Sequence, residues 1–389
     1  MTRKFSLRQA QLFRRFLTTV LVFLASNSVP AHAAPGDGHW DRQFGMPGTA
    51  SRNFALRFNE NSLYTGGASL AAGQIATNTV VNVFDGTKWS SLGEITGGLT
   101  VLYDFAFLGT DLYVGGLFQR AGDVPAFGLA TWDGANWSDV GGFSGVVSSL
   151  ATDGTNLYVG GFFTNSGGIF TTNVAKWNGA NWSALGDGIG YYADDLSQVV
   201  NVLLWHNGHL YAGGAFTNAG AVAANNLARW DGSGWSALGE GVAGTGGGFI
   251  GSPVTALQFI GDDLYVGGKF TTVGGNVPAL NVARWNGSEW SALGAGLRGP
   301  PSTGPVSALA SLGTELYAFG SFTNAGGITA RGLARWNGAN WSSFGSLNGA
   351  GIRAISDAGA ERPPASGFIP PGDAVHKITP ARRIVGIGE

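Results

Sequence analysis

The stretch from Leu264 to Gly294 reads LYVGGKFTTVGGNVPALNVARWNGSEWSALG and contains one complete copy of a repeated pattern. Leu-Tyr opens the copy, Gly-Gly follows after one residue, and two tryptophans flanking an Asn-Gly pair close it. The Leu-Tyr pair recurs along the chain at intervals of 45 to 54 residues. Its six tyrosines are Tyr64, Tyr113, Tyr158, Tyr211, Tyr265 and Tyr317. Self-similarity at this period is the signature of a tandem repeat fold.

Each repeat divides into four short strands. In the copy quoted above we expect them at residues 254–259, 264–270, 281–285 and 290–294. The Asn-Gly pair between the last two suits a tight hairpin, because both residues tolerate positive φ. The two tryptophans should then face each other across the hairpin, and the Gly-Gly doublet should mark a bulge or a close backbone approach. Four strands in about 50 residues predict an all-β fold, a β-propeller of four-stranded antiparallel blades.

The number of blades depends on the chain outside the six complete copies. Trp40 and the residues after it resemble an isolated last strand, and residues 351–356 resemble a first strand. A seventh blade built from both ends would close the ring through N- and C-terminal strands. We favour seven blades, with six blades and a loose tail as the alternative. The repeats then cover residues 35–345, and the proline-rich segment 346–389 either completes the seventh blade or is disordered.

Residues 1–34 have the features of an export signal peptide. Five Lys and Arg residues come first, an apolar run covers Phe16 to Ala25, and Ala31-His32-Ala33 offers a small-x-small cleavage site. The apolar run is too short for a transmembrane helix, which needs about 20 residues. We therefore expect a secreted, extracellular protein with no membrane span after cleavage. The periplasm and the cell surface are the alternative locations.

Composition excludes several classes of protein. Glycine accounts for 66 of the 389 residues, charged residues for 12%, and cysteine is absent. Without cysteine the chain has no disulfide, thiolate metal site or cysteine nucleophile. Removal of the signal, with its five basic residues, leaves 17 basic and 24 acidic residues, a net charge of −7. Such a chain is not expected to bind nucleic acid. We expect no cofactor and no metal site.

The motif resembles known repeat families. A strand ending in Gly-Gly and followed by tryptophan resembles the Kelch-like class of β-propeller. The fuller pattern, LYVGG followed by ARWNG, is closer to secreted bacterial repeat proteins and is similar to the ectodomain of fungal cortical polarity markers. The resemblance covers residues 36–345 and implies a propeller with a surface or extracellular role. It implies no activity, because such blades carry many unrelated functions. A copper radical oxidase of the galactose-oxidase kind is excluded, because its crosslinked cofactor needs a cysteine.

Binding is expected on the connections between strands. In a four-stranded meander, the connections from the last strand to the next blade share one rim with those from the second strand to the third. Three consecutive connections between blades are long: residues 186–198, 239–253 and 294–305. Their candidate ligand-binding residues are Tyr191, Tyr192, Asp194, Asp195, Phe249 and Arg298. Exposed tyrosines beside carboxylates suit a carbohydrate, a peptide or calcium, and an ordinary solvated loop is the alternative.

Other candidates have ordinary structural explanations. His206 and His209 flank a turn where other copies carry Asp, Asn or Glu, so we expect a turn and no metal pair there. The repeated basic residue before the first tryptophan, such as Arg284, should lie along a blade edge with its stem packed. Three Asn-Trp-Ser sequons, at Asn136, Asn181 and Asn340, contain tryptophans that the repeat itself explains.

Three functions are compatible with these observations. We favour a non-catalytic secreted propeller, a monomer that binds an extracellular glycan, peptide or envelope partner. The second is a glycan-active hydrolase or lyase that uses Asp194 or Asp195 together with Tyr191 or Tyr192. The third is a structural repeat of a surface layer or an adhesin.

Overall fold

The computed structural model describes most of the repeat region. The described residues are 51–59, 62–71, 74–75, 78–85, 88–98, 100–190, 198–244, 253–299 and 306–343. The expected export signal, the expected strand at Trp40 and the segment 346–389 lie outside them. The number of blades and the closure of a ring therefore stay predictions.

The described repeats form six blades of four antiparallel strands, which we call blades 1 to 6. Blades 2 to 6 are separate four-stranded sheets, and the four strands of blade 1 belong to a seven-stranded sheet that also includes β3, β8 and β9. Blade 1 contains β1 (Ser51–Asn59), β2 (Ser62–Ala71), β4 (Asn78–Phe84) and β5 (Trp89–Thr96). Blade 2 contains β6 (Val101–Leu108), β7 (Asp111–Leu117), β10 (Leu129–Trp132) and β11 (Trp137–Asp139). Blade 3 contains β12 (Val146–Thr152), β13 (Leu157–Phe162), β16 (Val174–Trp177) and β17 (Trp182–Ala184). Blade 4 contains β18 (Val199–His206), β19 (His209–Ala215), β22 (Leu227–Trp230) and β23 (Trp235–Ala237). Blade 5 contains β25 (Ala256–Ile260), β26 (Asp263–Gly267), β29 (Val282–Trp285) and β30 (Trp290–Ala292). Blade 6 contains β32 (Val306–Leu312), β33 (Glu315–Gly320), β36 (Leu333–Trp336) and β37 (Trp341–Ser343).

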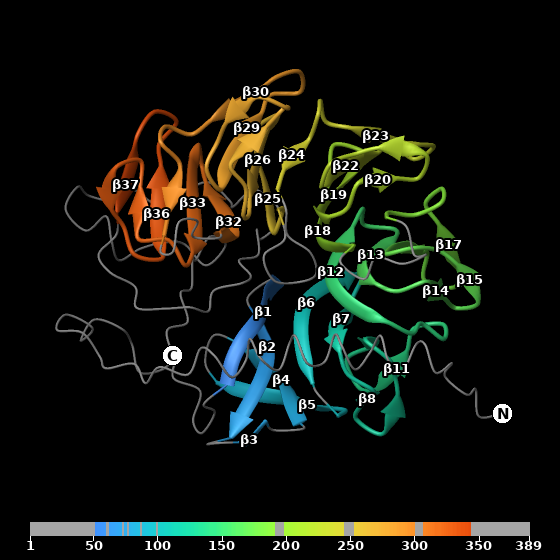
Figure 1. Ribbon diagram of the computed structural model, residues 1–389. Helices are drawn as coiled ribbons and strands as arrows, with labels where there is room; N and C mark the ends of the chain where they lie inside the picture. Colours follow the sequence, from blue (N-terminus) through green and yellow to red (C-terminus); the bar gives the residue numbers. More distant parts are fainter. Residues whose placement is uncertain are drawn as a thin grey trace, which may run out of the picture. The chain divides into compact units, whose positions relative to one another are not determined.

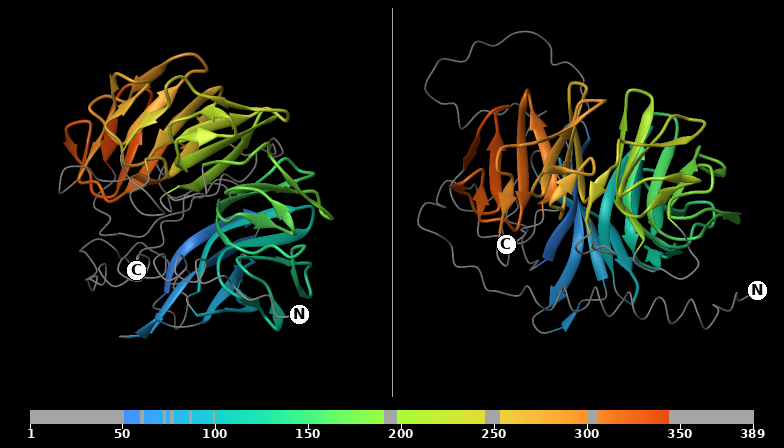
Figure 2. Two further views of the ribbon diagram at one scale, coloured as in Figure 1. Left: turned by 45° about the vertical axis from the view of Figure 1, so that its right-hand side comes forward. Right: turned by 45° about the horizontal axis from the view of Figure 1, so that its top comes forward.

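We call the four strands of each blade A to D in chain order. Figures 1 and 2 show the blades following one another in sequence order, and the A strands of consecutive blades are in contact. These findings confirm an all-β, propeller-like repeat architecture with four antiparallel strands per copy. Among the described residues, no helix is long and apolar enough to cross a membrane.

Small hairpins on the B-to-C connections join each blade to the one before it. These hairpins are β8–β9 (Arg120–Ala121, Val124–Pro125), β14–β15 (Asn165–Ser166, Ile169–Phe170), β20–β21 (Asn218–Ala219, Val222–Ala223), β27–β28 (Thr272–Val273, Val277–Pro278) and β34–β35 (Asn324–Ala325, Ile328–Thr329). In blade 1, β3 (Gln74–Ile75) pairs with β2. The chain that leaves strand D of the preceding blade pairs with the hairpin: β5 with β8, β24 (Val242–Ala243) with β27, and β31 (Leu297–Arg298) with β34. Single bridges, Phe143 to Ser166 and Ile189 to Ala219, take this place in the other two junctions.

The tryptophan pairs lie where the sequence places them. Trp285 is directly opposite Trp290 in the C–D hairpin of blade 5, and their ring centroids are 5.3 Å apart. The pairs of blades 2, 3, 4 and 6 repeat this geometry at 5.2–5.3 Å. The predicted cross-strand pairing is therefore confirmed.

The Gly-Gly doublet meets both of its expected roles. In blade 2 the register shifts between Leu102 and Asp104, opposite Gly115 and Gly116, so the bulge lies in strand A. A Cβ atom on Gly116 would collide with the carbonyl oxygen of Val101, and one on Gly115 with a side chain of blade 3. Only glycine allows this approach of strand B to both neighbours.

The second tryptophan of each pair forms a hydrogen bond across the blade junction. Its indole N–H donates to a main-chain carbonyl of the preceding blade at 2.8–3.1 Å; this carbonyl lies within strand D in blade 1 and directly after strand D in blades 2 to 5. The bonds join Trp137 to Leu92, Trp182 to Val140, Trp235 to Leu185, Trp290 to Leu238, and Trp341 to Leu293. We call this bond the indole lock.

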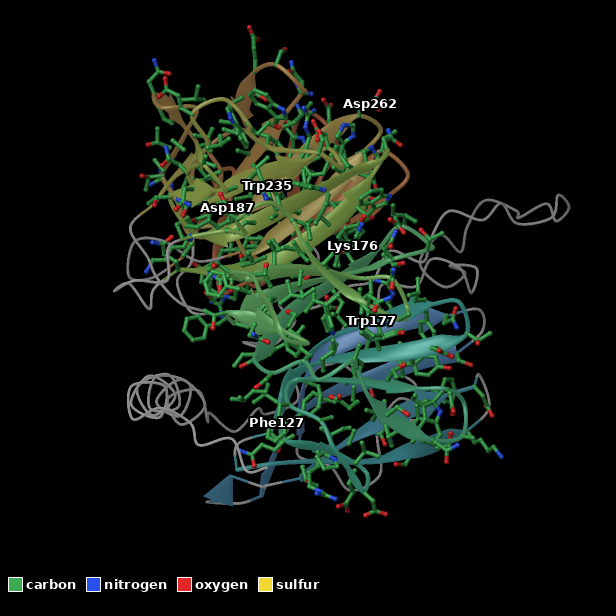
Figure 3. The ribbon with its side chains drawn as sticks, turned by 90° about the vertical axis from the view of Figure 1, so that its right-hand side faces the viewer. Phe127, Lys176, Trp177, Asp187, Trp235 and Asp262 are labelled. Atoms are coloured by element: carbon green, nitrogen blue, oxygen red, sulfur yellow. The ribbon has the colours of Figure 1, made fainter. Side chains whose placement is uncertain are left out.

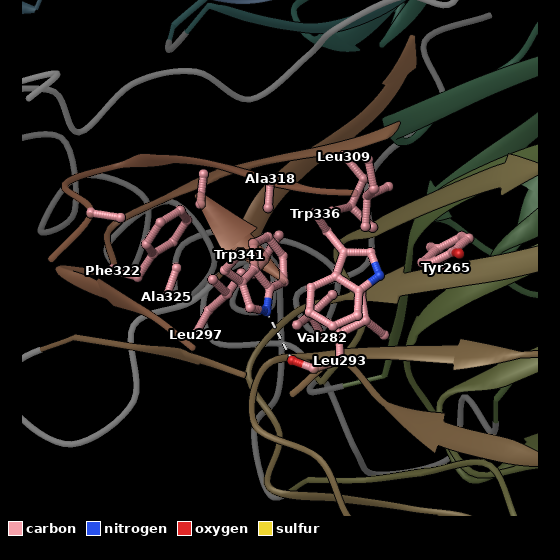
Figure 4. Packing of buried hydrophobic residues seen from close by; sticks show 14 of the residues in the cluster. Tyr265, Val282, Leu293, Leu297, Leu309, Ala318, Phe322, Ala325, Trp336 and Trp341 are labelled. Carbon is pink, nitrogen blue, oxygen red and sulfur yellow. Dashed lines mark hydrogen bonds between the residues drawn. The ribbon is translucent and has the colours of Figure 1, made fainter. Parts of the chain in front are cut away.

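The apolar core lies between the blades. In the cluster between blades 5 and 6, Leu293 and Leu297 pack with Phe322 and Trp341 (Figure 4). The dashed line in Figure 4 marks the indole lock of Trp341, which therefore lies inside an apolar cluster. A buried donor and acceptor in such a place must satisfy each other.

Trp205, the only tryptophan outside the repeated pattern, has a role between blades. It lies on strand A of blade 4 and stacks on Tyr158 of blade 3, with centroids 5.1 Å apart and planes 14° apart. Phe107 and Phe259 take the corresponding place against the repeat tyrosines Tyr64 and Tyr211. Strand A of one blade thus supplies an aromatic partner for the Leu-Tyr motif of the previous blade.

Removal of the indole lock is expected to destabilise the protein more than the same loss of ring volume at the other tryptophan of the pair. In blade 3, Trp182 donates to Val140 O, whereas the buried Nε1 of Trp177 has no hydrogen-bond partner among the described residues. We expect Trp182→Phe to lower the free energy of unfolding by about 0.5–1.5 kcal/mol more than Trp177→Phe, because it removes one buried hydrogen bond while Val140 O keeps its bond from Phe143 N. Urea unfolding of the two variants measures the difference. Equal losses would show that only ring volume matters.

Candidate functional site

The connections predicted to share one rim are joined directly in the structure. The chain leaving strand D pairs with the B–C hairpin of the next blade, for example Val242 with Val273 and Leu297 with Ala325. We call the surface formed by the D-to-A and B-to-C connections the loop rim. The A-to-B and C-to-D turns form the opposite surface, the turn rim.

Most of the predicted binding residues lie outside the described residues. These are Tyr191, Tyr192, Asp194, Asp195 and Phe249. Arg298 lies on β31 with its side chain exposed on the loop rim, and its carbonyl oxygen accepts a 2.7 Å hydrogen bond from Thr323 N. The structure therefore places one of the six candidates.

Buried asparagines hold the start of each long connection. Asn173, Asn226 and Asn281 precede strand C of blades 3, 4 and 5, with φ of 60°, 64° and 64°. Asn281 Oδ1 accepts from Phe270 N at 3.2 Å, and its Nδ2 donates to Leu297 O at 2.6 Å. The other two side chains repeat the second bond, Asn173 to Ile189 O at 3.1 Å and Asn226 to Val242 O at 2.7 Å. These three blades are the ones from which the long connections leave.

Blade 2, which a short connection leaves, and blade 6 have glycine at this position. Gly128 and Gly332 keep the positive φ, 84° and 77°, but they offer no side chain to the next connection. Positive φ favours glycine and asparagine, so the backbone explains the choice of residue type. The Nδ2 bond explains why asparagine is used before a long connection. The sequence shows asparagine at this position in three blades and glycine in two. The reason for the difference is visible only from the Nδ2 hydrogen bond to the next connection.

The asparagine has two separable roles, backbone and side chain. We expect Asn226→Gly to lower the free energy of unfolding by about 1–3 kcal/mol, because Val242 O loses its donor. Asn226→Ala should cost about 1–2 kcal/mol more, because alanine is strained at positive φ. Urea unfolding measures the order. Asn207→Gly, at a positive-φ turn that is exposed, is the control and should change little. Equal stability of the two Asn226 variants would contradict the left-handed backbone.

Exposed apolar side chains gather on the B-to-C connections. Phe170 is 70% exposed and Phe127 is 42% exposed, and Ile328 and Ile169 are 40% and 37% exposed. Phe127 is labelled in Figure 3. All four belong to the loop rim, and the rest of the fold does not bury them. Aromatic side chains left exposed on a rigid hairpin are typical of a recognition surface. They were not predicted from the sequence, because a single apolar residue in a connection has no distinguishing period.

On the turn rim, two arginines form ion pairs with acids of the same blade. Arg284 pairs with Asp263 at 3.3 Å, and Arg335 pairs with Glu315 at 3.2 Å. His206 stacks on Phe259 at 3.7 Å, and burial lowers the pKa of the His206 imidazole. No group of three or more His, Asp or Glu residues that could hold a metal ion occurs in the described part of the chain.

Asp104 is a buried carboxylate on strand A of blade 2. It accepts hydrogen bonds from Leu150 N at 2.7 Å, Ser149 Oγ at 3.1 Å and Phe105 N at 2.8 Å. Burial raises the pKa of the Asp104 carboxyl, while these bonds and the charge of Arg57 oppose the rise. Ser149 Oγ in turn accepts from Leu203 N of blade 4 at 3.0 Å. Buried acids with a raised pKa often mark active sites. Here, apart from the bond from Phe105 N within its own strand, the contacts join one A strand to the next.

The raised pKa of Asp104 predicts a pH-dependent stability. A folded-state pKa above the ordinary value of 3.8 favours the neutral acid, so the contribution of Asp104 is present below that value. It is lost as pH rises through the raised pKa. We expect the free energy of unfolding of the native chain, relative to Asp104→Asn, to fall as the pH rises above about 4, the ordinary carboxyl pKa. Urea unfolding at increasing pH measures the difference, and a rising difference would show that Arg57 dominates.

No family model and no curated protein matches this chain. Among solved structures, it is similar to the computationally designed Ika8 protein, with 15% identity over 80% of each chain and a TM-score of 0.45. It is also similar to the computationally designed Ika4 protein, with 14% identity over 48% of this chain and 94% of that chain, and a TM-score of 0.30. The pairing of the strands establishes the repeat architecture.

Proposed function

We propose that this protein is a secreted, non-catalytic propeller whose loop rim binds an extracellular glycan, peptide or envelope partner. The observation that carries the proposal is the exposed Phe170 on a hairpin whose backbone is fixed against blade 2. A 70% exposed phenylalanine gains nothing within the fold, and its burial by a ligand is favourable. The asparagine anchors support the same surface, because they fix the places where the long connections leave the blades.

The proposed architecture is a closed, Kelch-like ring. Each described junction repeats the indole lock, so a further blade can join by the same contacts. The Trp40 segment and residues 346–389 are the parts of the chain that would complete a seventh blade between blades 6 and 1. This arrangement would leave no open sheet face at either end of the row of blades.

The proposal treats the protein as non-catalytic because the described acids have structural roles. Asp104 joins A strands, and Asp263 and Glu315 pair with strand-C arginines. A glycan-active enzyme would need a pair of catalytic acids. Asp194 and Asp195 are the pair available for that role, and they belong to the surface that the binding experiment tests.

A glycan and peptide array with residues 35–389 tests the function. The test variant is Phe127→Ser/Phe170→Ser, and the control is Glu289→Ser, an exposed residue of a C–D turn on the turn rim. We expect specific binding that weakens about tenfold or more in the test variant, because aromatic anchors dominate recognition surfaces. Glu289→Ser should bind as the native chain does.

Two outcomes would contradict the proposal. Equal binding by all three proteins would remove the loop rim as the recognition surface. An absence of binding across the array would favour a structural role in a surface layer. Thermal midpoints of the three proteins establish that each is folded, so that a loss of binding reports on the surface alone.

A further inference from the structure

We propose that the loop rim of blades 5 and 6 is a basic surface that binds an anionic polysaccharide. This inference rests on the proposed function and names the ligand class for one sector of the rim. Lys269 lies in the B-to-C connection of blade 5, Arg298 on β31, and Arg331 in the B-to-C connection of blade 6. All three side chains are exposed. We call them the basic sector.

The connections that carry the basic sector contain no acid. Residues 268–281, 294–305 and 320–332 include no Asp or Glu. Among the described residues, none forms an ion pair with Lys269, Arg298 or Arg331. Glu240, on the connection that leaves blade 4, lies against Gly275 of the blade 5 hairpin. Three positive charges without an ion pair among the described residues outnumber this one acid, so the local potential is positive.

On the turn rim of the same two blades, two basic residues are paired with acids. Arg284 and Arg335, in the same two blades, pair with Asp263 and Glu315. The chain as a whole has 22 basic and 24 acidic residues, so general attraction to polyanions is not expected. The positive charge of the basic sector is therefore local. We expect an anionic ligand to bind at this sector and not over the whole surface.

The backbone under the three side chains is held in place. Lys269 N donates to Pro253 O at 3.2 Å, and Thr323 N donates to Arg298 O at 2.7 Å. Arg331 precedes Gly332, whose N–H donates to Phe322 O at 3.0 Å. Side chains that start from a fixed backbone lose less conformational entropy on binding.

The neighbouring exposed groups favour a sugar over an acidic peptide. Hydroxyl side chains surround the basic sector: Thr271, Ser321, Thr323 and Thr329 are exposed. Hydroxyls both donate to and accept from sugar hydroxyls. The one large apolar side chain exposed on these connections is Ile328, in the described residues. A peptide interface usually needs a cluster of apolar or aromatic anchors, whereas carboxylate or sulfate groups on a polysaccharide need fixed cations and hydrogen-bonding neighbours.

Surface-immobilised polyanions test the proposal, with residues 35–389 in solution. The probes are heparin for sulfate, polygalacturonate for carboxylate, dextran as the neutral polysaccharide and poly-glutamate as the acidic peptide. The test variant is Lys269→Ala/Arg298→Ala/Arg331→Ala. The matched control is Lys88→Ala/Lys176→Ala/Arg229→Ala, which removes the same charge from blades 1, 3 and 4 outside the loop rim. Thermal midpoints verify that both variants fold.

We expect heparin or polygalacturonate to bind, dextran not to bind, and binding to weaken as salt rises. The test variant should bind about tenfold more weakly and the control less than about twofold more weakly. Three outcomes would overturn the proposal: no binding to either polyanion, equal weakening by both variants, or equally tight binding to poly-glutamate. Array binding lost in Phe127→Ser/Phe170→Ser without polyanion binding would overturn this inference and leave the proposed function standing.

Discussion

One hydrogen bond, from a buried indole to a main-chain carbonyl of the preceding blade, organises every described junction that follows blade 1. The carbonyl lies in an apolar cluster, where the loss of the indole hydrogen bond would cost about 0.5–1.5 kcal/mol. The indole reaches it because the neighbouring positions are glycine: Trp341 packs against Gly294 of blade 5 and Gly326 of its own hairpin, both with positive φ. Five of the tryptophans, and the glycines beside them, therefore serve a single contact that is repeated at five junctions.

The fold could be predicted because the residues that recur in sequence are the residues that make this contact. Trp290 lies on strand D and also forms the hydrogen bond to the preceding blade. Gly115 and Gly116 lie where neighbouring strands approach too closely for a side chain. Trp205 could not be interpreted from the repeat, because its partner Tyr158 belongs to another blade. The hairpins on the B-to-C connections were missed for the same reason. They are stabilised by pairing with the preceding blade, and two-residue strands have no detectable period.

The candidate site was less predictable than the fold. Chain topology identified the loop rim, since connection lengths are visible in sequence, and Arg298 was found in this way. Phe127 and Phe170 were missed, because an apolar residue in a loop looks the same whether it is buried or exposed. Asp104 stands out within the apolar strand VLYDFAFL, yet its hydrogen bonds to blade 3 are tertiary and could not be derived from the strand.

A single position shows how a uniform scaffold presents different chemistry. The residue before the positive-φ Asn or Gly of strand C is Phe127, Thr172, Asn225, Leu280 and Arg331 in blades 2 to 6. The next residue is restricted by its backbone to glycine or asparagine, whereas this one ranges from aromatic to cationic. Thr172 is buried, and Phe127 and Arg331 are exposed. In blades 2 to 5 the carbonyl oxygen at this position accepts a main-chain hydrogen bond whichever side chain is present. The side chain can therefore differ between blades, so that an exposed aromatic residue in blade 2 and an exposed cation in blade 6 occur at the same position of the loop rim.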